Sequence, residues 1–126
     1  MDKPISCVYV IKCPYTQSVL YVGQTANFKV RKIAHLTCTK TYSPIGLYMS
    51  YMRSIYVTPI IEVYKVTRSS ALFNQEQIAM RYFRKLGVPL LNKNGFRSKL
   101  HEAIEKYIPN YSQIDKRNKY LKEVQP

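Results

Sequence analysis

The stretch C-V-Y-V-I-K-C-P-Y-T-Q-S-V-L-Y-V-G-Q-T, residues 7–25, decides the fold of this chain. It holds two short runs rich in β-branched and aromatic residues around a polar turn, which predicts a β-hairpin. Because side chains alternate between strand faces, Tyr9 and Tyr21 each share a face with the residues two positions away: Cys7 and Ile11 in the first strand, Val19 and Gly23 in the second. If Tyr9 pairs opposite Tyr21, or two residues from that position, both phenols emerge on one face of the sheet. A register slip of one residue would separate them.

The composition indicates one globular domain of ordinary size. The chain has 126 residues, 46% of them apolar and 21% charged, and such a length can bury a core without disulfides or a structural metal. No apolar run reaches the roughly 18 residues of a membrane span. An acid and a proline near the start, M-D-K-P-I-S-C, do not fit a signal peptide, so we expect a cytoplasmic protein. Three cysteines without C-x-x-C spacing are expected to be reduced thiols.

Charge is the most informative property of the composition. Lys and Arg number 20 against 7 Asp and Glu, for a net charge of +13. Residues 1–98 carry 14 of the basic residues and only three of the acids, Asp2, Glu62 and Glu76. The basic surface therefore belongs to the folded body and not to a tail. This excess predicts an anionic partner, most simply nucleic acid.

Two helices and a third strand are predicted after the hairpin. Asn27 can cap a helix that runs to about Cys38. One side of this helix carries Val30, Ile33, Ala34 and Thr37, and the other carries Phe28, Arg31 and His35. Ser43 and Pro44 open a second helix. Residues 57–66 are rich in β-formers and include a proline at 59, which predicts a strand at a sheet edge or beginning near that proline.

A strongly periodic helix follows, with Ser69 or Ser70 as its cap and Gly87 as its end. Residues 90–92 can add a short strand. We therefore expect an α+β domain over residues 1–97, and a C-terminal helical extension of the same domain over residues 98–126.

Glu76 has an unusual place in this helix. Helical spacing puts it in the middle of a narrow apolar stripe formed by Leu72, Ala79, Phe83 and Leu86. It is also the only acid between Glu62 and Glu102. An ionised carboxylate on an apolar face is costly unless it meets a cation. That cation is either a Lys or Arg in an ordinary salt bridge or a divalent metal ion.

The order and spacing of these residues resemble the GIY-YIG nuclease family. Cys7-Val8-Tyr9 matches the first tyrosine motif and Tyr21-Val22-Gly23 the second, and the pattern continues through Arg31, His35, Glu76 and Asn92. It covers roughly residues 5–95. The chain departs from the family pattern where Cys7 replaces a glycine, Val8 and Val22 replace isoleucines, and Tyr42 occupies a loop in which some phage intron members have a histidine.

The resemblance implies a small three-stranded antiparallel sheet flanked by helices, acting as a DNA phosphodiesterase with one divalent ion, Mg²⁺ or Mn²⁺. The catalytic residues that it implies are Tyr9, Tyr21, Arg31, His35, Glu76 and Asn92, with Glu76 as the metal ligand. Gly23 is a structural motif residue in this comparison, and Tyr42 is a candidate for a role in its loop.

The chemistry of phosphodiester hydrolysis suits these residue types. A single Mg²⁺ held by one carboxylate keeps several waters and can bind a phosphate oxygen, which is the role expected of Glu76. Tyr9 is the candidate base, provided that nearby cations favour its phenolate, and Tyr21 would orient the water or the phosphate. Arg31 would stabilise charge in the transition state. Asn92 would either hold a water on the metal or orient a neighbouring tyrosine.

The expected function is that of a metal-dependent DNA endonuclease of the homing type, free-standing in a phage or mobile element. DNA is the expected partner, with no membrane and no small-molecule substrate. Two alternatives stay open: a non-catalytic basic nucleic-acid-binding module with the same fold, and a structure-selective repair or junction nuclease. Single residues also have purely structural alternatives, namely packing for the tyrosines, solvation for His35 and strand termination for Asn92.

Overall fold

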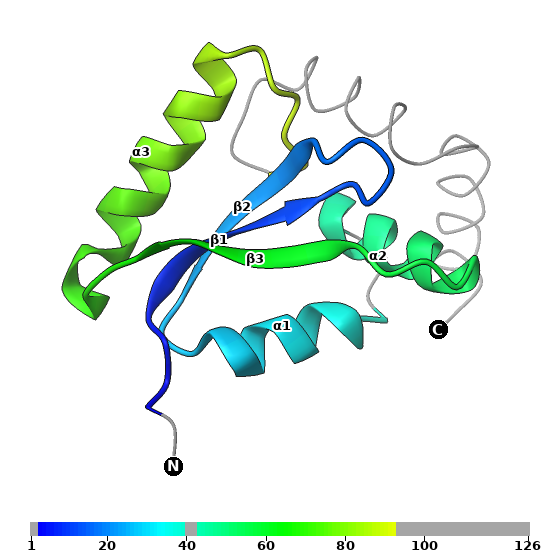
Figure 1. Cartoon of the computed structure of the whole chain (residues 1–126), viewed down its shortest axis with the longest axis horizontal. Helices are drawn as coiled ribbons and strands as arrows, with labels where there is room; N and C mark the ends of the chain where they lie inside the picture. The colour runs from blue at the N-terminus through cyan, green and yellow to red at the C-terminus, as the bar shows by residue number, and fades with distance from the viewer. Residues whose placement is uncertain (1–2, 40–42, 93–126) are drawn as a thin grey trace, which may run out of the picture.

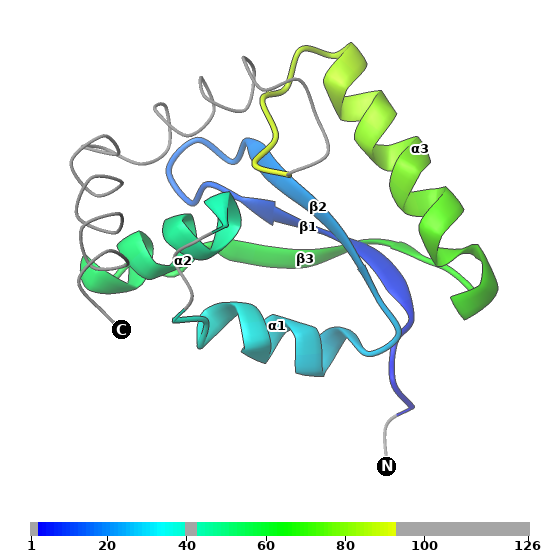
Figure 2. The same ribbon diagram turned by 180° about the vertical axis from the view of Figure 1, so that it is seen from behind.

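A computed structural model of the chain describes residues 3–39 and 43–92. Within them a three-stranded antiparallel sheet, ordered β2-β1-β3, has α1 and α2 on one face and α3 on the other (Figure 1, and from behind in Figure 2). The elements in chain order are β1 (Cys7–Lys12), β2 (Val19–Thr25), α1 (Phe28–Leu36), α2 (Pro44–Ser54), β3 (Ile60–Val66), a 3₁₀ turn (Ser69–Ala71) and α3 (Leu72–Lys85). The predicted α+β class with this sheet is confirmed. The predicted helical extension lies outside the described residues.

The hairpin has a register that brings the two tyrosines to the same face. Tyr9 pairs with Gly23 and Ile11 pairs with Tyr21, so Tyr9 lies two residues from the position opposite Tyr21. The centroids of the two phenol rings are 6.3 Å apart. The prediction that both phenols emerge on one face is confirmed.

A β-bulge near the turn changes the other end of the hairpin. The register shifts after Ile11, because Lys12 pairs with Val19 and leaves Leu20 as the extra residue. Leu20 packs on the face that carries Tyr21, whereas Val19 packs on the opposite face. The prediction that Val19 shares a face with Tyr21 is therefore wrong, since the extra residue reverses the alternation of side chains.

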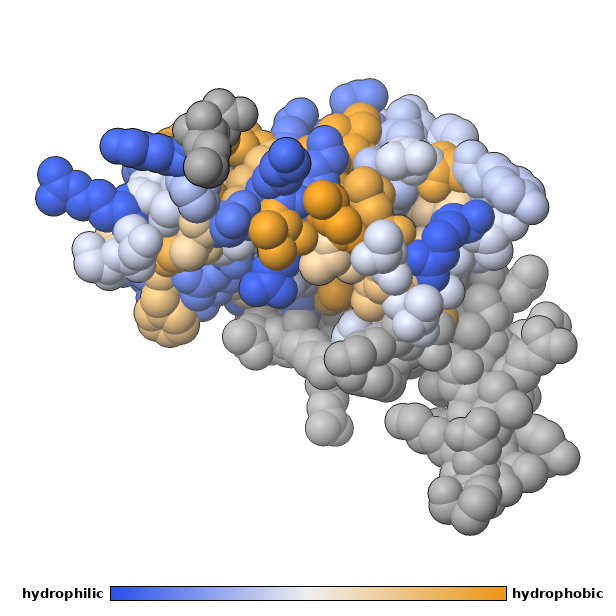
Figure 3. Space-filling view, turned by 90° about the horizontal axis from the view of Figure 1, so that it is seen from below, coloured by the Kyte–Doolittle hydropathy of each residue, from blue (hydrophilic) through white to orange (hydrophobic). Residues whose placement is uncertain are grey.

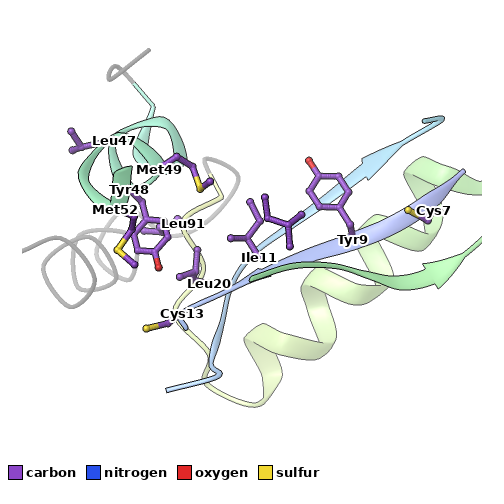
Figure 4. Packing of buried hydrophobic residues seen from close by; sticks show 11 residues of the cluster. Cys7, Tyr9, Ile11, Cys13, Leu20, Leu47, Tyr48, Met49, Met52 and Leu91 are labelled. Carbon is purple, nitrogen blue, oxygen red and sulfur yellow. The ribbon is translucent and has the colours of Figure 1, made fainter. Parts of the chain in front are cut away.

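Alternation along β1 divides the core into two parts. The face that we call the tyrosine face carries Cys7, Tyr9 and Ile11, which pack with Leu20, Leu47, Tyr48, Met49, Met52 and Leu91 (Figure 4). The face that we call the valine face carries Val8, Val10 and Val22, which pack with Ala79, Met80, Phe83 and Leu90. Cys7, which replaces the family glycine, is fully buried in the first of these clusters.

The first two helices begin where the sequence predicts. The Asn27 side chain accepts a hydrogen bond from the backbone N–H of Val30, and the Ser43 side chain accepts one from Gly46. Each cap satisfies a backbone donor that the first turn of a helix leaves without a partner. The first helix ends at Leu36 and is thus shorter than predicted.

The predicted division of α1 into two sides is only partly correct. The side with Phe28 and His35 faces the sheet. Ala34 and Thr37, predicted on the side of Val30 and Ile33, instead line a pocket together with Arg31 and His35. Phe28 and His35 both contact the Tyr9 ring. Val30 and Ile33 lie on the outer side, where they are 60% and 53% exposed. Seen from the α1 side, the surface accordingly shows an apolar patch bordered by hydrophilic side chains (Figure 3). The sheet contacts of α1 are thus made largely by residues of the predicted catalytic side.

An arginine of α2 ties the end of α1 in place. The guanidinium of Arg53 donates hydrogen bonds to the carbonyl oxygens of Leu36, at 3.1 Å, and Cys38, at 2.6 Å. The last carbonyls of a helix have no partner within the helix, so this side chain completes the C-terminal end of α1. That end carries His35.

The third helix differs from its prediction at both ends. It begins after a 3₁₀ turn, and its cap residue Ala71 makes no side-chain hydrogen bond, so the predicted serine cap is wrong. Gly87 has a φ of 81° and ends the helix as predicted, because this conformation favours glycine. Leu86 is 62% exposed and leaves the predicted stripe, and Met80 is buried beside Ala79 instead.

The third strand lies at the edge of the sheet and pairs only with β1 among the described strands. It begins at Ile60, directly after Pro59, and not at residue 57. Among the helices of residues 3–39 and 43–92, none has the length and apolar character needed to span a membrane.

Candidate active site

Three aromatic rings meet on the tyrosine face of the sheet. The Tyr9 hydroxyl and Nε2 of His35 are hydrogen-bonded at 2.7 Å. The ring centroid of His35 is 5.5 Å from that of Tyr9 and 5.6 Å from that of Tyr21. Residues from the central strand, the edge strand and α1 therefore form one cluster, in which Tyr9 is only 2% exposed.

Gly23 leaves the space that the Tyr9 ring occupies. A Cβ atom at Gly23 would overlap the ring, with Cε1 of Tyr9 only 2.8 Å away. These two residues are cross-strand partners, so the glycine lets the ring lie flat over the neighbouring strand. The structure thus gives the motif glycine a packing reason.

Burial and charge set the protonation of this cluster. Burial, followed by the positive charge of Arg31, lowers the pKa of His35 to about 4. Burial also raises the pKa of Tyr9 and of Tyr21, while Arg31 acts in the opposite direction on both phenols. Both phenols and the imidazole are therefore neutral at neutral pH, and one of the two hydrogen-bonding atoms, Tyr9 Oη or His35 Nε2, donates to the other.

Glu76 lies beside this cluster, on the side of β2. It lines a pocket of about 410 Å³ together with Tyr21, Ser43, Pro44, Ile45, Met80, Leu91 and Asn92. Burial raises the pKa of its carboxyl group, and a hydrogen bond from Gln77 acts in the opposite direction. The negative charge of Glu76 raises the pKa of both Tyr9 and Tyr21. The carboxylate is thus close enough to influence both phenols. We call this pocket the Glu76 pocket.

No Lys or Arg among residues 3–39 and 43–92 forms a salt bridge with Glu76. The ion pair found in this part of the chain joins Lys12 and Glu62 on β1 and β3. The described residues therefore leave the Glu76 carboxylate without the basic partner that an ordinary structural salt bridge would require.

Asn92 uses its side chain as a substitute for a neighbouring strand. Its Oδ1 accepts a hydrogen bond from the N–H of Val22 at 3.0 Å, and its Nδ2 donates one to the carbonyl of Val22 at 2.7 Å. Leu91 donates from its backbone to the carbonyl of Leu20 at 2.6 Å. Residues 90–92 are thus not the predicted strand, because a side-chain amide makes the bonds that a strand backbone would make. Asn92 thus holds the backbone of Val22, the residue between Tyr21 and Gly23.

A second pocket adjoins the first between the end of α1 and the beginning of α2. It has a volume of about 400 Å³, is lined in part by Arg31 and His35, and shares Ser43 and Ile45 with the Glu76 pocket. We call it the flanking pocket. It places the exposed Arg31 next to the aromatic cluster.

The Glu76 pocket has the donor set of a hard divalent cation. Its lining includes the Glu76 carboxylate and three other residues with side-chain oxygens, namely Tyr21, Ser43 and Asn92. The Asn92 and Ser43 oxygens each already accept one backbone hydrogen bond, which leaves each a second lone pair. Residues 3–39 and 43–92 contain no group of three or more His, Cys, Asp or Glu side chains that could hold a metal. Mg²⁺ does not require one, because it binds through one or two carboxylates and retains water. These residues fit a Mg²⁺-type ion and do not fit a closed zinc site.

The predicted site residues thus fall into two adjoining groups. Tyr9, Tyr21, Gly23 and His35 are in contact, and Glu76 and Asn92 lie in a pocket with Tyr21. Arg31 lies in the flanking pocket, and Tyr42 lies outside the described residues. Sequence reasoning missed Ser43 as a lining residue of both pockets. The sequence predicted Ser43 only as the residue that caps the second helix.

Comparison with known proteins gives no relative for this chain. No family model matches it, and no curated protein or solved structure matches it either. The resemblance to the GIY-YIG nucleases therefore rests on the motif residues of the sequence alone.

Proposed function

We propose that this protein is a divalent-metal-dependent DNA endonuclease that hydrolyses phosphodiester bonds. The observation that carries the proposal is the half-buried Glu76 carboxylate, which lines an open pocket together with Tyr21 and has no basic partner among the described residues. A buried carboxylate without a cation is unfavourable, so a ligand cation would relieve it. The net charge of +13 supports a polyanionic substrate.

Glu76 and the oxygen atoms around it would hold the metal ion. When bound, the ion would supply positive charge that stabilises the phosphate in the transition state and favours the phenolate forms of nearby tyrosines. Burial raises the pKa of both phenols, and the charge of Arg31 opposes that rise. Arg31 would act on the phosphate from the flanking pocket.

Tyr9 and Tyr21 differ in their access to the Glu76 pocket, and this difference assigns them different roles. Tyr21 lines the Glu76 pocket, whereas Tyr9 is 2% exposed and lines neither pocket. Tyr21 is therefore the phenol that meets the attacking water, and Tyr9 lies behind it. In this proposal Tyr21 takes the proton from the water and Tyr9 accepts one from Tyr21, which differs from the expectation that Tyr9 itself is the base.

A proton can then pass inward along hydrogen-bonded neighbours. The water gives its proton to the Tyr21 oxygen, Tyr21 gives its own to Tyr9, and Tyr9 gives its own to Nε2 of His35. The water oxygen forms a bond to phosphorus, the bond from phosphorus to the leaving oxygen breaks, and solvent protonates the leaving oxygen. His35 is neutral at the start, so one ring nitrogen has a lone pair that can take this proton.

The test compares Glu76→Gln with Glu62→Gln. The two substitutions are chemically identical, but Glu62 is exposed and paired with Lys12. We expect Glu76→Gln to lower plasmid cleavage in Mg²⁺ or Mn²⁺ by about 1,000-fold or more, and to keep DNA affinity. Glu62→Gln should cut nearly as well as the wild type. EDTA should abolish cleavage by all three proteins.

Thermal melts separate a metal ligand from a structural salt bridge. Because the folded state raises the pKa of Glu76, its contribution to stability is present at low pH and is lost as pH rises through the folded pKa. At neutral pH without metal, Glu76→Gln should therefore be as stable as the wild type or slightly more so, and Mg²⁺ should stabilise only the wild type. A loss of roughly 3 to 5 kcal/mol in EDTA, together with residual cutting, would show that Glu76 holds a buried cation of the protein.

A further inference from the structure

In the reaction described above, the flanking pocket contributes only Arg31, and the rest of its space has no assigned ligand. It lies between the C-terminal end of α1 and the N-terminal end of α2, and it is continuous with the Glu76 pocket through Ser43 and Ile45. Its volume of about 400 Å³ falls within the range of pockets that bind small organic groups. A group bound there would therefore adjoin a phosphate bound beside Tyr21.

The lining of this pocket combines an apolar surface with polar groups. Ala34 and Ile45 supply the apolar part, and Arg31, Thr37, Thr39 and Ser43 supply the polar part. The Ser43 oxygen accepts a hydrogen bond from Gly46, so its own O–H remains to donate to a ligand. No described residue forms a salt bridge with Arg31, whose planar guanidinium suits a phosphate. A cation, a hydroxyl donor and an apolar surface together match a nucleotide better than a bare anion.

We propose that the flanking pocket holds the nucleotide next to the scissile phosphate. The sugar and base of this nucleotide lie over Ala34 and Ile45, and its phosphate groups are bound by Arg31 and by the Ser43 hydroxyl. This subsite rests on the proposed nuclease function. It adds that the enzyme binds one of the two nucleotides that flank the scissile phosphate, namely the one on the side of α1.

A tryptophan at position 34 would fill the pocket without altering a residue assigned to catalysis. Val30→Trp is the matched control, because it adds the same ring to the same helix on the outer, 60% exposed side. With a duplex substrate and Mg²⁺, we expect Ala34→Trp to lower kcat/KM by about tenfold or more. Val30→Trp should stay within about twofold of the wild type, as surface substitutions usually do. Melting curves of both variants establish that they are folded.

Binding is measured separately from cutting in the Glu76→Gln background. NMR titration with the dinucleotide dTpdT should shift the amide signals of Ala34, Thr37 and Ser43, and the added tryptophan at position 34, but not at position 30, should suppress these shifts. Inorganic phosphate alone should not reproduce the pattern. If it does, the pocket is a simple anion site and the nucleotide subsite is wrong.

The outcomes distinguish this subsite from the proposed function. If the wild type cuts DNA while both tryptophan variants cut and bind dTpdT alike, the subsite is overturned and the nuclease stands. If the wild type cuts no DNA with any divalent metal, the proposed function fails and the subsite falls with it.

Discussion

The two faces of the sheet use alternate residues of the same strands, yet they differ in what they bury. The valine face packs Val8, Val10 and Val22 against apolar side chains of α3. The tyrosine face buries the Tyr9 hydroxyl against an imidazole. Burying a polar group is costly unless it is hydrogen-bonded. We therefore expect burial on the tyrosine face to stabilise the fold less than burial on the valine face does. Neighbouring positions of one strand therefore enter an apolar cluster on one face and the proposed site on the other.

The candidate site lies where the two faces meet, at the outer edge of β2. Tyr21 reaches the Glu76 pocket from the tyrosine face, and Met80 reaches it from the valine face. The helix that stabilises the valine face thus also carries the carboxylate of the site. Substitutions on the two faces should show whether stability depends mainly on the valine face and the proposed cleavage mainly on the tyrosine face.

Among the comparisons between the two faces, the largest expected effect comes from Tyr9→Phe, compared with Val10→Ala one residue away. Removing the Tyr9 hydroxyl interrupts the path to His35 and should lower cleavage by about 100-fold or more, which is a typical loss for acid–base groups. Val10→Ala should lower the free energy of unfolding by roughly 2 kcal/mol and leave cleavage nearly unchanged at a temperature where it is folded. Urea unfolding and plasmid cleavage measure both quantities. A Tyr9→Phe variant with near-normal rates would remove Tyr9 from the mechanism.

The second effect is a pH dependence that belongs to the tyrosine face alone. The pKa of His35 is about 4 in the folded protein, against about 6.5 in an unfolded chain. The lowered value means that its contribution to stability is complete above pH 6.5 and is lost as pH falls through 4. The full difference is at most about 3 kcal/mol, because His35 is only partly buried. Unfolding free energies of the wild type and His35→Gln between about pH 7 and about pH 4 should converge as pH falls. Parallel curves would mean that His35 titrates normally.

The smallest of the three effects is expected for Gly23→Ala. The added methyl group would overlap the Tyr9 ring, which must shift from its place beside His35. Overpacking of this kind typically costs about 1 to 3 kcal/mol. Cleavage should fall as well, and the double variant Gly23→Ala/Tyr9→Phe should lose little more activity than Tyr9→Phe alone. Fully additive losses would show that the glycine acts independently of the Tyr9 ring.

Features set by local pattern could be predicted from the sequence. Strand alternation placed Tyr9 and Tyr21 on one face, and the caps at Asn27 and Ser43 marked helix starts, because each depends on residues only a few positions apart. The position of Glu76 on an otherwise apolar helix face signalled a special environment for the same reason.

Features that depend on contacts between distant segments could not be predicted. The bulge at Leu20 arises from how the hairpin turn closes, which the strand pattern does not specify. The pairing of Asn92 with Val22 joins residues 70 positions apart. The flanking pocket is lined by residues of 31–39 and 43–46, in and next to two successive helices, and it depends on how α1 and α2 pack together, which the pattern of neither helix specifies.

The hydrogen bonds of Asn92 also affect how solvent reaches the edge of the sheet. Val22 lies on the outer strand, yet its amide proton is held by a side chain from far along the chain. Deuterium can replace that proton when one amide group rotates away, without any strand separating, whereas exchange at central residues of β1 requires the sheet to open. The exchange rate at Val22 therefore reports how often the Asn92 side chain opens at the wall of the Glu76 pocket. A ligand that orders this pocket should slow amide exchange at Val22 and leave amide exchange at Val10 unchanged.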